Sequence, residues 1–231
     1  MTNPFASPRD YPEMLNKISI WTLLDSLLLT VITALVCPNV GNLLGRFSIK
    51  VDIYGGVTVP LLYAVPPIVI AVFARVVRLH DKISDLFAIR ENFDIGEILV
   101  PLAGGVGYPL DLAKLEVLRA KRKQLMSDTF YRYASSTEPK IQKHLIVSAL
   151  DKWSWYWILV EFLAVSFLCL GILLSCGVYK SAAWLATIML IFMFLGIWGH
   201  RFCGSAARAE VREILGDPNR SAEISAIFHA L

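Results

Sequence analysis

Two carboxylates stand inside long apolar stretches of the sequence, Asp25 within residues 18–37 and Glu161 within residues 153–176. A charged side chain inside a membrane-crossing helix costs roughly 2.5 kcal/mol or more on insertion scales, so it usually faces protein or water. Asp25 lies eight residues past Lys17, and Glu161 lies nine residues past Lys152. At ~1.5 Å of rise per helical residue, we expect both carboxylates at a similar depth, about 12–13 Å from the cytoplasmic side.

Two interpretations of this acidic pair are open. In one, several copies of the chain place Asp25 and Glu161 in a ring that lines a path for cations or protons. In the other, the acids pair with Arg75 or His200, or are protonated and donate hydrogen bonds between helices. We favour the second interpretation, because polar groups inside membrane helices commonly stabilise helix packing.

A second cluster of charge is the basic run Arg119, Lys121, Arg122 and Lys123. Such a run can hold anionic lipid headgroups or an acidic protein partner, or it can form an ordinary solvated helix face. Shortly before it stands the glycine-rich segment 104–107. This segment matches neither the dinucleotide fingerprint nor the P-loop, so we interpret it as a turn rather than an anion site.

The sequence offers no pattern typical of a metal site or an enzyme. There is no CxxC pair, the four histidines are dispersed, and neither Gly-x-Ser-x-Gly nor His-Glu-x-x-His occurs. We therefore expect no catalysis, no metal and no cofactor. Cys37 and Cys176 fall at the outer ends of two apolar stretches, where a disulfide is geometrically feasible, but Cys169 and Cys203 indicate that cysteine also serves as small filler.

Composition defines the class of protein that must position these residues. The 231 residues are 56% hydrophobic and 18% charged, with a mean hydropathy of +0.58. Ordinary globular chains are about 25% charged, and disordered chains are poor in apolar residues. Four cysteines argue against a disulfide-rich secreted module, and a net charge of +3 argues against direct nucleic-acid binding. The chain is predicted to be an all-α polytopic membrane protein.

Four stretches meet the length of about 20 apolar residues that a membrane crossing needs. They are residues 18–37, 57–77, 153–176 and 181–199. The intervening segments are 1–17, 38–56, 78–152, 177–180 and 200–231. We interpret the first stretch as a retained helix rather than a cleaved signal. Three prolines in the second, Pro60, Pro66 and Pro67, predict static bends more readily than a gating hinge.

Lysine and arginine residues orient the predicted spans. Three lie in the segments 38–56 and 177–180, whereas eighteen lie in residues 1–17, 78–152 and 200–231. Because the cytoplasmic side retains basic residues, both termini and the segment 78–152 are predicted to be cytoplasmic. The expected location is the inner (plasma) membrane.

The segments outside the spans also carry structural signals. Residues 47–54 alternate apolar and polar side chains, which predicts a strand that pairs within segment 38–56 or with another copy of the chain. The second span is expected to continue as a helical stalk to about residue 87, and a helix is expected over 110–133. Another should start at 139–140 and run into the third span, and the tail should form two helices that break at 216–219.

In span count, size and loop polarity, the chain resembles the small four-span membrane subunits of bacterial phage-defence systems, such as the Kiwa membrane subunit. The resemblance implies a membrane-anchored sensor or effector that works with a cytoplasmic partner. We therefore expect an oligomeric sensor or scaffold whose partners are membrane lipid, further copies of itself and a cytoplasmic protein. The alternative is a pore-forming or ion-conducting effector; a transporter is less favoured, since four spans without a repeat leave little room for a midplane site.

Overall fold

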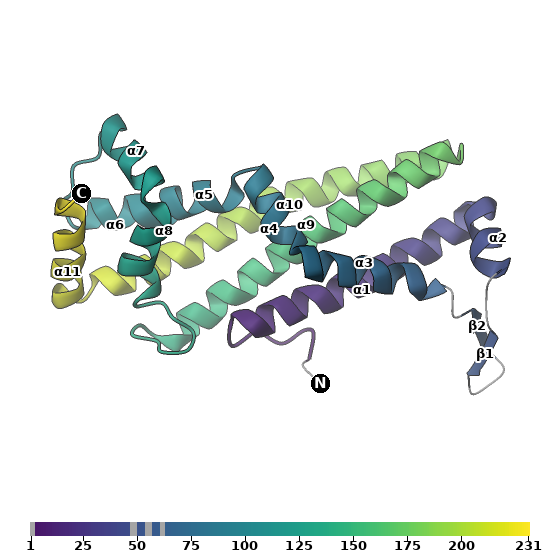
Figure 1. Cartoon of the computed structure of the whole chain (residues 1–231), viewed down its shortest axis with the longest axis horizontal. Coiled ribbons are helices and arrows are strands. Elements are labelled where there is room, and N and C mark those ends of the chain that lie inside the picture. Colours follow the sequence, from purple (N-terminus) through teal and green to yellow (C-terminus); the bar gives the residue numbers. More distant parts are fainter. Residues whose placement is uncertain (1–2, 47–49, 54–56, 61–62) are drawn as a thin grey trace. The chain divides into compact units, whose positions relative to one another are not determined.

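The structure is a computed structural model that describes residues 3–46, 50–53, 57–60 and 63–231. Among these residues every regular element is helical except one two-stranded hairpin (Figure 1), which confirms the all-α prediction in its main part. The α-helices are α1 Tyr11–Val36, α2 Pro38–Arg46, α3 Val65–Val77, α4 Leu79–Leu86, α5 Ile89–Phe93, α6 Val100–Gly105, α7 Leu112–Ala120, α8 Arg122–Leu125, α9 Lys143–Ser175, α10 Tyr179–Leu215 and α11 Pro218–His229. Two π-helical turns, η2 Asp94–Leu99 and η3 Met126–Tyr131, and the strands β1 Lys50–Ile53 and β2 Val57–Pro60 complete the list.

The chain divides into two compact units. Unit 1 comprises Met1–Phe5, Leu15–His80 and Trp155–Trp198, and unit 2 comprises Ala6–Met14, Asp81–Ser154 and Gly199–Leu231. After Met14 the chain therefore leaves unit 2 twice, and each time it returns. Unit 1 contains most of the apolar sequence, and unit 2 contains most of the charged residues of segments 78–152 and 200–231.

Three helices are long and apolar enough to cross a membrane: α1, α9 and α10. They contain the predicted spans 18–37, 153–176 and 181–199. At 33 and 37 residues, α9 and α10 exceed the 20 or so residues that ~30 Å of hydrocarbon requires. Both helices therefore continue well past their apolar parts. The sequence predicts this for α9, whereas α10 includes residues for which a separate helix of the tail was expected.

The second predicted span, 57–77, is shorter in the structure than the sequence indicated. Its first residues form the strand β2, and the helix α3 begins only at Val65. Pro66 and Pro67 occupy its first turn, where a missing backbone N–H breaks no helical hydrogen bond. The 13 residues of α3 rise about 20 Å, less than the hydrocarbon thickness, so α3 is not a full crossing by length alone.

The helical stalk expected after the second span is broken once, at Arg78, and a second bend at Ala88 follows its predicted end. Arg78, between α3 and α4, has a φ of 53°, and Ala88, between α4 and α5, has a φ of 50°. Both values lie in the left-handed region, which costs a non-glycine residue roughly 1–2 kcal/mol. The sequence shows no glycine or proline at either bend, so the prediction of a continuous helix to residue 87 was wrong.

The hairpin pairs β1 with β2 in antiparallel register, with Val51 opposite Val59 and Asp52 opposite Thr58. The predicted strand is thus found in its second half, and it pairs within the same segment of the chain. Residues 47–49 and 54 of the predicted strand lie outside the described residues.

Helices α1, α3, α9 and α10 form the core of unit 1. One apolar cluster joins Leu29, Val165 and Cys169, and Ile70 of α3 packs against it. A second cluster joins Cys37, Leu173 and Ala182 at the ends of α1 and α9 and the start of α10. Small residues at these positions let the helices approach closely.

Unit 2 has a core of its own, formed by η2, α6, α7, α10 and α11. Its most completely buried side chains are Leu99, Leu102, Leu118, Ile214, Ile224 and Phe228. Gly105 at the end of α6 packs closely on Leu215, because an added Cβ would lie 2.3 Å from a methyl carbon of Leu215 and that side chain would have to move.

Other helix boundaries predicted for unit 2 agree only in part with the structure. The helix expected over 110–133 is divided into α7, α8 and η3, with a break at Lys121. Helix α9 begins at Lys143, a few residues later than predicted. The predicted break at 216–219 is confirmed, since α10 ends at Leu215 and the carboxylate of Asp217 caps α11 by accepting from the backbone N–H of Asn219.

Candidate functional site

The most deeply buried acid of unit 1 is Glu161, whose residue is 2% exposed. The hydroxyl of Thr22 on α1 donates a hydrogen bond to its Oε2. On the other side, Oε1 lies 3.4 Å from Nδ1 of His80 in α4. The cluster therefore joins α1, α4 and α9 through polar contacts in an apolar environment. Groups that are buried in this way stabilise a fold only while they remain paired.

Arg75 lies beside this cluster and forms no ion pair with an acid among the residues that the structure describes. Its guanidinium donates to Oδ1 of Asn16 at 3.2 Å and to the hydroxyl of Ser19 at 3.4 Å, both on α1. A cavity of about 10 Å³ is lined by Ser19, Arg75, His80 and Glu161 together with apolar residues. This volume is about enough for one water molecule.

The partners that the sequence suggested for the acids are not the observed ones. Glu161 pairs with His80 rather than with Arg75 or His200. His200 belongs to unit 2, where its ring centroid lies 5.5 Å from that of Phe93. Sequence reasoning missed His80, although its position three residues past the end of a predicted span was an available signal.

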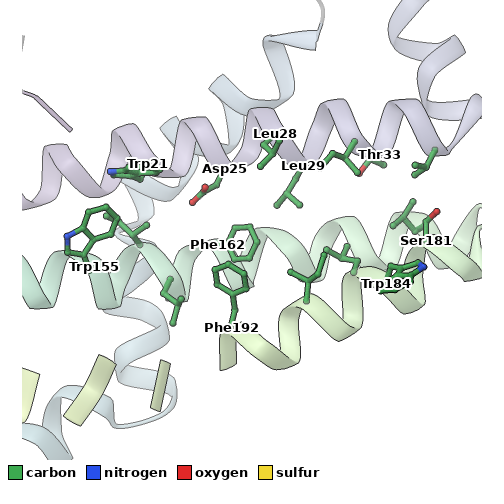
Figure 2. A pocket seen from close by; sticks show the side chains of 17 residues that line it. Trp21, Asp25, Leu28, Leu29, Thr33, Trp155, Phe162, Ser181, Trp184 and Phe192 are labelled. Carbon is green, nitrogen blue, oxygen red and sulfur yellow. The ribbon is translucent and has the colours of Figure 1, made fainter. Parts of the chain in front are cut away.

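Asp25 has a different environment from Glu161. It lines an apolar groove of about 630 Å³ between α1, α9 and α10. Figure 2 shows its carboxylate projecting from α1 into this groove, with Phe162 and Phe192 on the opposite wall. No hydrogen bond or ion pair to Asp25 is found within the described parts of the chain. The two intramembrane acids are thus not brought together: one is internally paired, and the other opens on the groove.

Aromatic rings form one end of the groove. The ring centroids of Trp21 and Trp155 are 5.4 Å apart, and both residues line the groove next to Asp25 (Figure 2). The ammonium of Lys17 lies 4.4 Å from the centroid of the Trp155 ring. Tryptophan and lysine together are typical of the region where a helix meets the membrane surface.

The basic run of unit 2 is partly used inside the fold. Arg122 pairs with Asp94, whose residue is 5% exposed, and Arg119 pairs with Glu116 at 3.0 Å. Burial raises the pKa of Asp94 above its usual value, although the charges of Arg122 and Arg90 act in the opposite direction. Only Lys121 and Lys123 of the run are exposed without a recorded ion pair in the described chain, so the predicted basic surface is smaller than its sequence suggests.

The glycine-rich segment has the features of a turn. Gly107 adopts a φ of +72°, and the following helix α7 is capped by Asp111, whose carboxylate accepts from the backbone N–H of Lys114 at 2.8 Å. That negative charge at the helix start opposes anion binding. Among the residues that the structure covers, no group of three or more histidine, cysteine or acidic side chains is placed to bind a metal.

Two apolar side chains project from unit 2 where α4 turns into α5. Leu86 is 76% exposed and Phe87 is 66% exposed, and the strained residue Ala88 follows them directly. Exposed apolar side chains next to one another on a turn are a feature of interaction surfaces.

The fold and its polar clusters define a helical protein with three long apolar helices compatible with a membrane and a separate, more polar helical unit. The sequence matches the YmfE protein family over residues 10–225, and the chain belongs to this family. Comparison with curated proteins and with solved structures gave no match. The family match does not connect the chain to phage-defence subunits, so that resemblance stays a prediction.

Proposed function

We propose that this protein is an oligomeric sensor or scaffold of the inner membrane that recruits or signals to a soluble cytoplasmic partner. The observation that carries the proposal is the division of the chain into an apolar unit 1 and an independently cored unit 2 that holds about half of the residues. A unit of this size exceeds what is needed to connect membrane helices, since such connections need only a few residues. We propose phage defence as its biological role, because the layout of the chain resembles the membrane subunits of phage-defence systems.

The proposed topology has four crossings with both termini in the cytoplasm. The chain leaves unit 2 after Met14 and returns at Asp81, and it leaves again after Ser154 and returns at Gly199. If unit 2 lies on one side of the membrane, each of the segments Leu15–His80 and Trp155–Trp198 crosses the membrane an even number of times. We assign the return of the first crossing to helix α3, although its 13 residues are shorter than a usual crossing. Its contacts support an antiparallel pair with α1: Arg75 bonds Ser19 near the start of α1, whereas Ile70 packs against the cluster that includes Leu29 further along.

The state of Glu161 supports a scaffold more than a pore. A pore lined by an acidic ring needs carboxylates that face water or another copy. Glu161 is instead 2% exposed and contacts Thr22 and His80 of its own chain. The ion-conducting alternative therefore depends on Asp25 alone. The other residues that line the groove beside Asp25 are almost all apolar.

The partner surface is proposed to include Leu86 and Phe87. They are adjacent in the sequence and both are largely exposed, which supports a contact with protein. Lys121 and Lys123 would favour an acidic partner or anionic lipid nearby. Assembly of several copies is proposed through α10, because only 11% of its apolar window is buried within one chain.

Site-specific photo-crosslinking in the host tests the partner surface. A photoreactive phenylalanine analogue at Phe87 should give a discrete adduct with one soluble protein, whereas the same group at exposed Glu138 in unit 2 should not. An adduct at position 87 that contains only lipid or a second copy of this chain would contradict recruitment of a soluble partner through this surface.

A further inference from the structure

The groove beside Asp25 has the size and lining of a ligand site. Its volume of about 630 Å³ lies within the range of about 300–1,000 Å³ that is usual for small-molecule pockets. Three helices of unit 1 form it, so its walls are rigid elements rather than loops. Its lining is apolar and aromatic except for a few polar side chains, among them Asp25, Thr33 and Ser181.

We propose that this groove binds a lipophilic organic cation, that is, an apolar body that carries one positively charged nitrogen, and that the charge lies beside Asp25. This inference goes beyond the proposed function and does not depend on it. The chain could recruit its partner with the groove occupied or empty.

The charge of the ligand follows from what surrounds Asp25. A carboxylate in an apolar environment is costly unless a positive charge or a hydrogen-bond donor compensates it. No lysine, arginine or histidine lines the groove, and the described residues provide Asp25 with no hydrogen bond or ion pair. The groove thus presents an acid without a partner among the described residues, and an organic cation would supply the countercharge that its ionised form needs.

Aromatic rings beside the acid suit the same ligand. Trp21 and Trp155 lie next to Asp25 at one end of the groove (Figure 2), and Phe162 and Phe192, whose centroids are 4.7 Å apart, form a wall. Ring faces attract organic cations, and tryptophan does so most strongly. Lys17 over the Trp155 ring already demonstrates one such contact within the chain.

Two other occupants fit the groove less well. Residues 18–37, 153–176 and 181–199 of a second copy bring no countercharge, because they contain no lysine or arginine. The span 57–77 contains Arg75, but that guanidinium already bonds Asn16 and Ser19 of its own chain. A phospholipid ammonium belongs near the membrane surface, whereas Asp25 lies eight residues beyond Lys17, or about 12 Å along the helix. Lipid acyl chains can fill the groove, but they leave Asp25 without a counterion.

Equilibrium binding of ethidium, a planar organic cation, to the full-length protein in phosphatidylcholine nanodiscs tests the proposal. Phenanthridine, the uncharged parent ring system, is the matched ligand control. Wild-type protein should bind ethidium saturably, and Asp25→Asn should weaken that affinity by about tenfold or more. Ser181→Ala changes a polar side chain of the same groove without touching the charge, so it should retain the wild-type affinity within about twofold.

A second variant keeps the test decisive if Asp25→Asn disturbs folding. Leu28 lines the groove and is 55% exposed, so Leu28→Trp should fill the groove while the carboxylate and the core remain. This variant should lose ethidium binding although Asp25 is intact. Equal ethidium affinity in wild type, Asp25→Asn and Leu28→Trp, or partition without saturation, would overturn the proposal.

Discussion

Oε1 of Glu161 in α9 lies 3.4 Å from Nδ1 of His80 in α4, and both side chains are buried within unit 1. Because Thr22 of α1 donates to the other carboxylate oxygen, one acid connects three helices that are distant in the sequence. His80 is the last residue of unit 1 before the chain enters unit 2. The cluster therefore fixes the point at which the chain passes from one unit to the other.

Truncation of Glu161 should destabilise the protein strongly. Glu161→Ala removes the acceptor that His80 and Thr22 share, and loss of a buried hydrogen-bond partner costs about 1–3 kcal/mol. Glu161→Gln keeps the size and one hydrogen-bonding oxygen and should cost less than half as much. Thermal unfolding of the detergent-solubilised protein measures both changes, with Glu138→Ala as an exposed control. A Glu161→Ala variant that unfolds at the wild-type temperature would show that the cluster does not stabilise unit 1.

Within the basic run, Arg122 and Lys123 should respond oppositely to alanine substitution. Arg122→Ala leaves Asp94 buried without its main counterion and should lower the free energy of unfolding by roughly 3 kcal/mol. Lys123→Ala, at an exposed position, should change it by no more than about 0.5 kcal/mol. The double variant Asp94→Asn/Arg122→Ala should recover part of the loss, since it also removes the unpaired charge. Equal effects of the two single variants would contradict the assignment of Arg122 to the interior.

Glu210 should make the stability of unit 2 decrease as the pH rises. It lies eleven residues past the apolar stretch 181–199, is 4% exposed, and burial raises its pKa from 4.5 to about 8. Between these two pH values the folded state binds more protons than the unfolded state, so the free energy of unfolding decreases with pH over that window. A difference of one pH unit between the folded and unfolded pKa corresponds to about 1.4 kcal/mol.

The Glu210→Gln variant should remove this slope, because it mimics the protonated acid at every pH. Chemical denaturation at pH 5 and pH 9 measures the change in the free energy of unfolding, and Glu138→Gln is the exposed control. The account of Glu210 fails if wild type and Glu210→Gln lose the same stability between the two pH values.

Charge-neutral variants of the two intramembrane acids distinguish the scaffold from the ion-conducting alternative. Asp25→Asn and Glu161→Gln should leave the crosslink at position 87 intact, since neither acid belongs to the proposed partner surface. In planar bilayers we expect no current that depends on Asp25. A cation current in the wild-type protein that Asp25→Asn abolishes would favour the pore.

The long elements were predictable from the sequence, because their signals are local. Long apolar stretches predicted α1, α9 and α10, and the Asp217-Pro218 pair predicted the start of α11. The same local reasoning failed for α3. Composition alone cannot tell the apolar residues 57–60 of a strand from those of a helix, and prolines in a first turn look like prolines that kink an interior.

The site was less predictable than the fold, because its contacts are non-local. The position of Asp25 and Glu161 inside apolar stretches was visible, but their separation into a groove and a buried cluster depends on how α1, α4 and α9 pack. The bends at Arg78 and Ala88, which carry neither glycine nor proline, bring His80 to Glu161 and expose Phe87. Tertiary packing imposes such left-handed backbone conformations, and no sequence pattern predicts them.

The native mass of the particle, purified in nanodiscs from its own host, tests the central claim most directly. The account predicts a defined oligomer of the 25.8 kDa chain with a stoichiometric soluble protein attached, and loss of that protein in Leu86→Ser/Phe87→Ser while the oligomer remains. A bare particle whose mass is the same for wild type and this variant would contradict the scaffold.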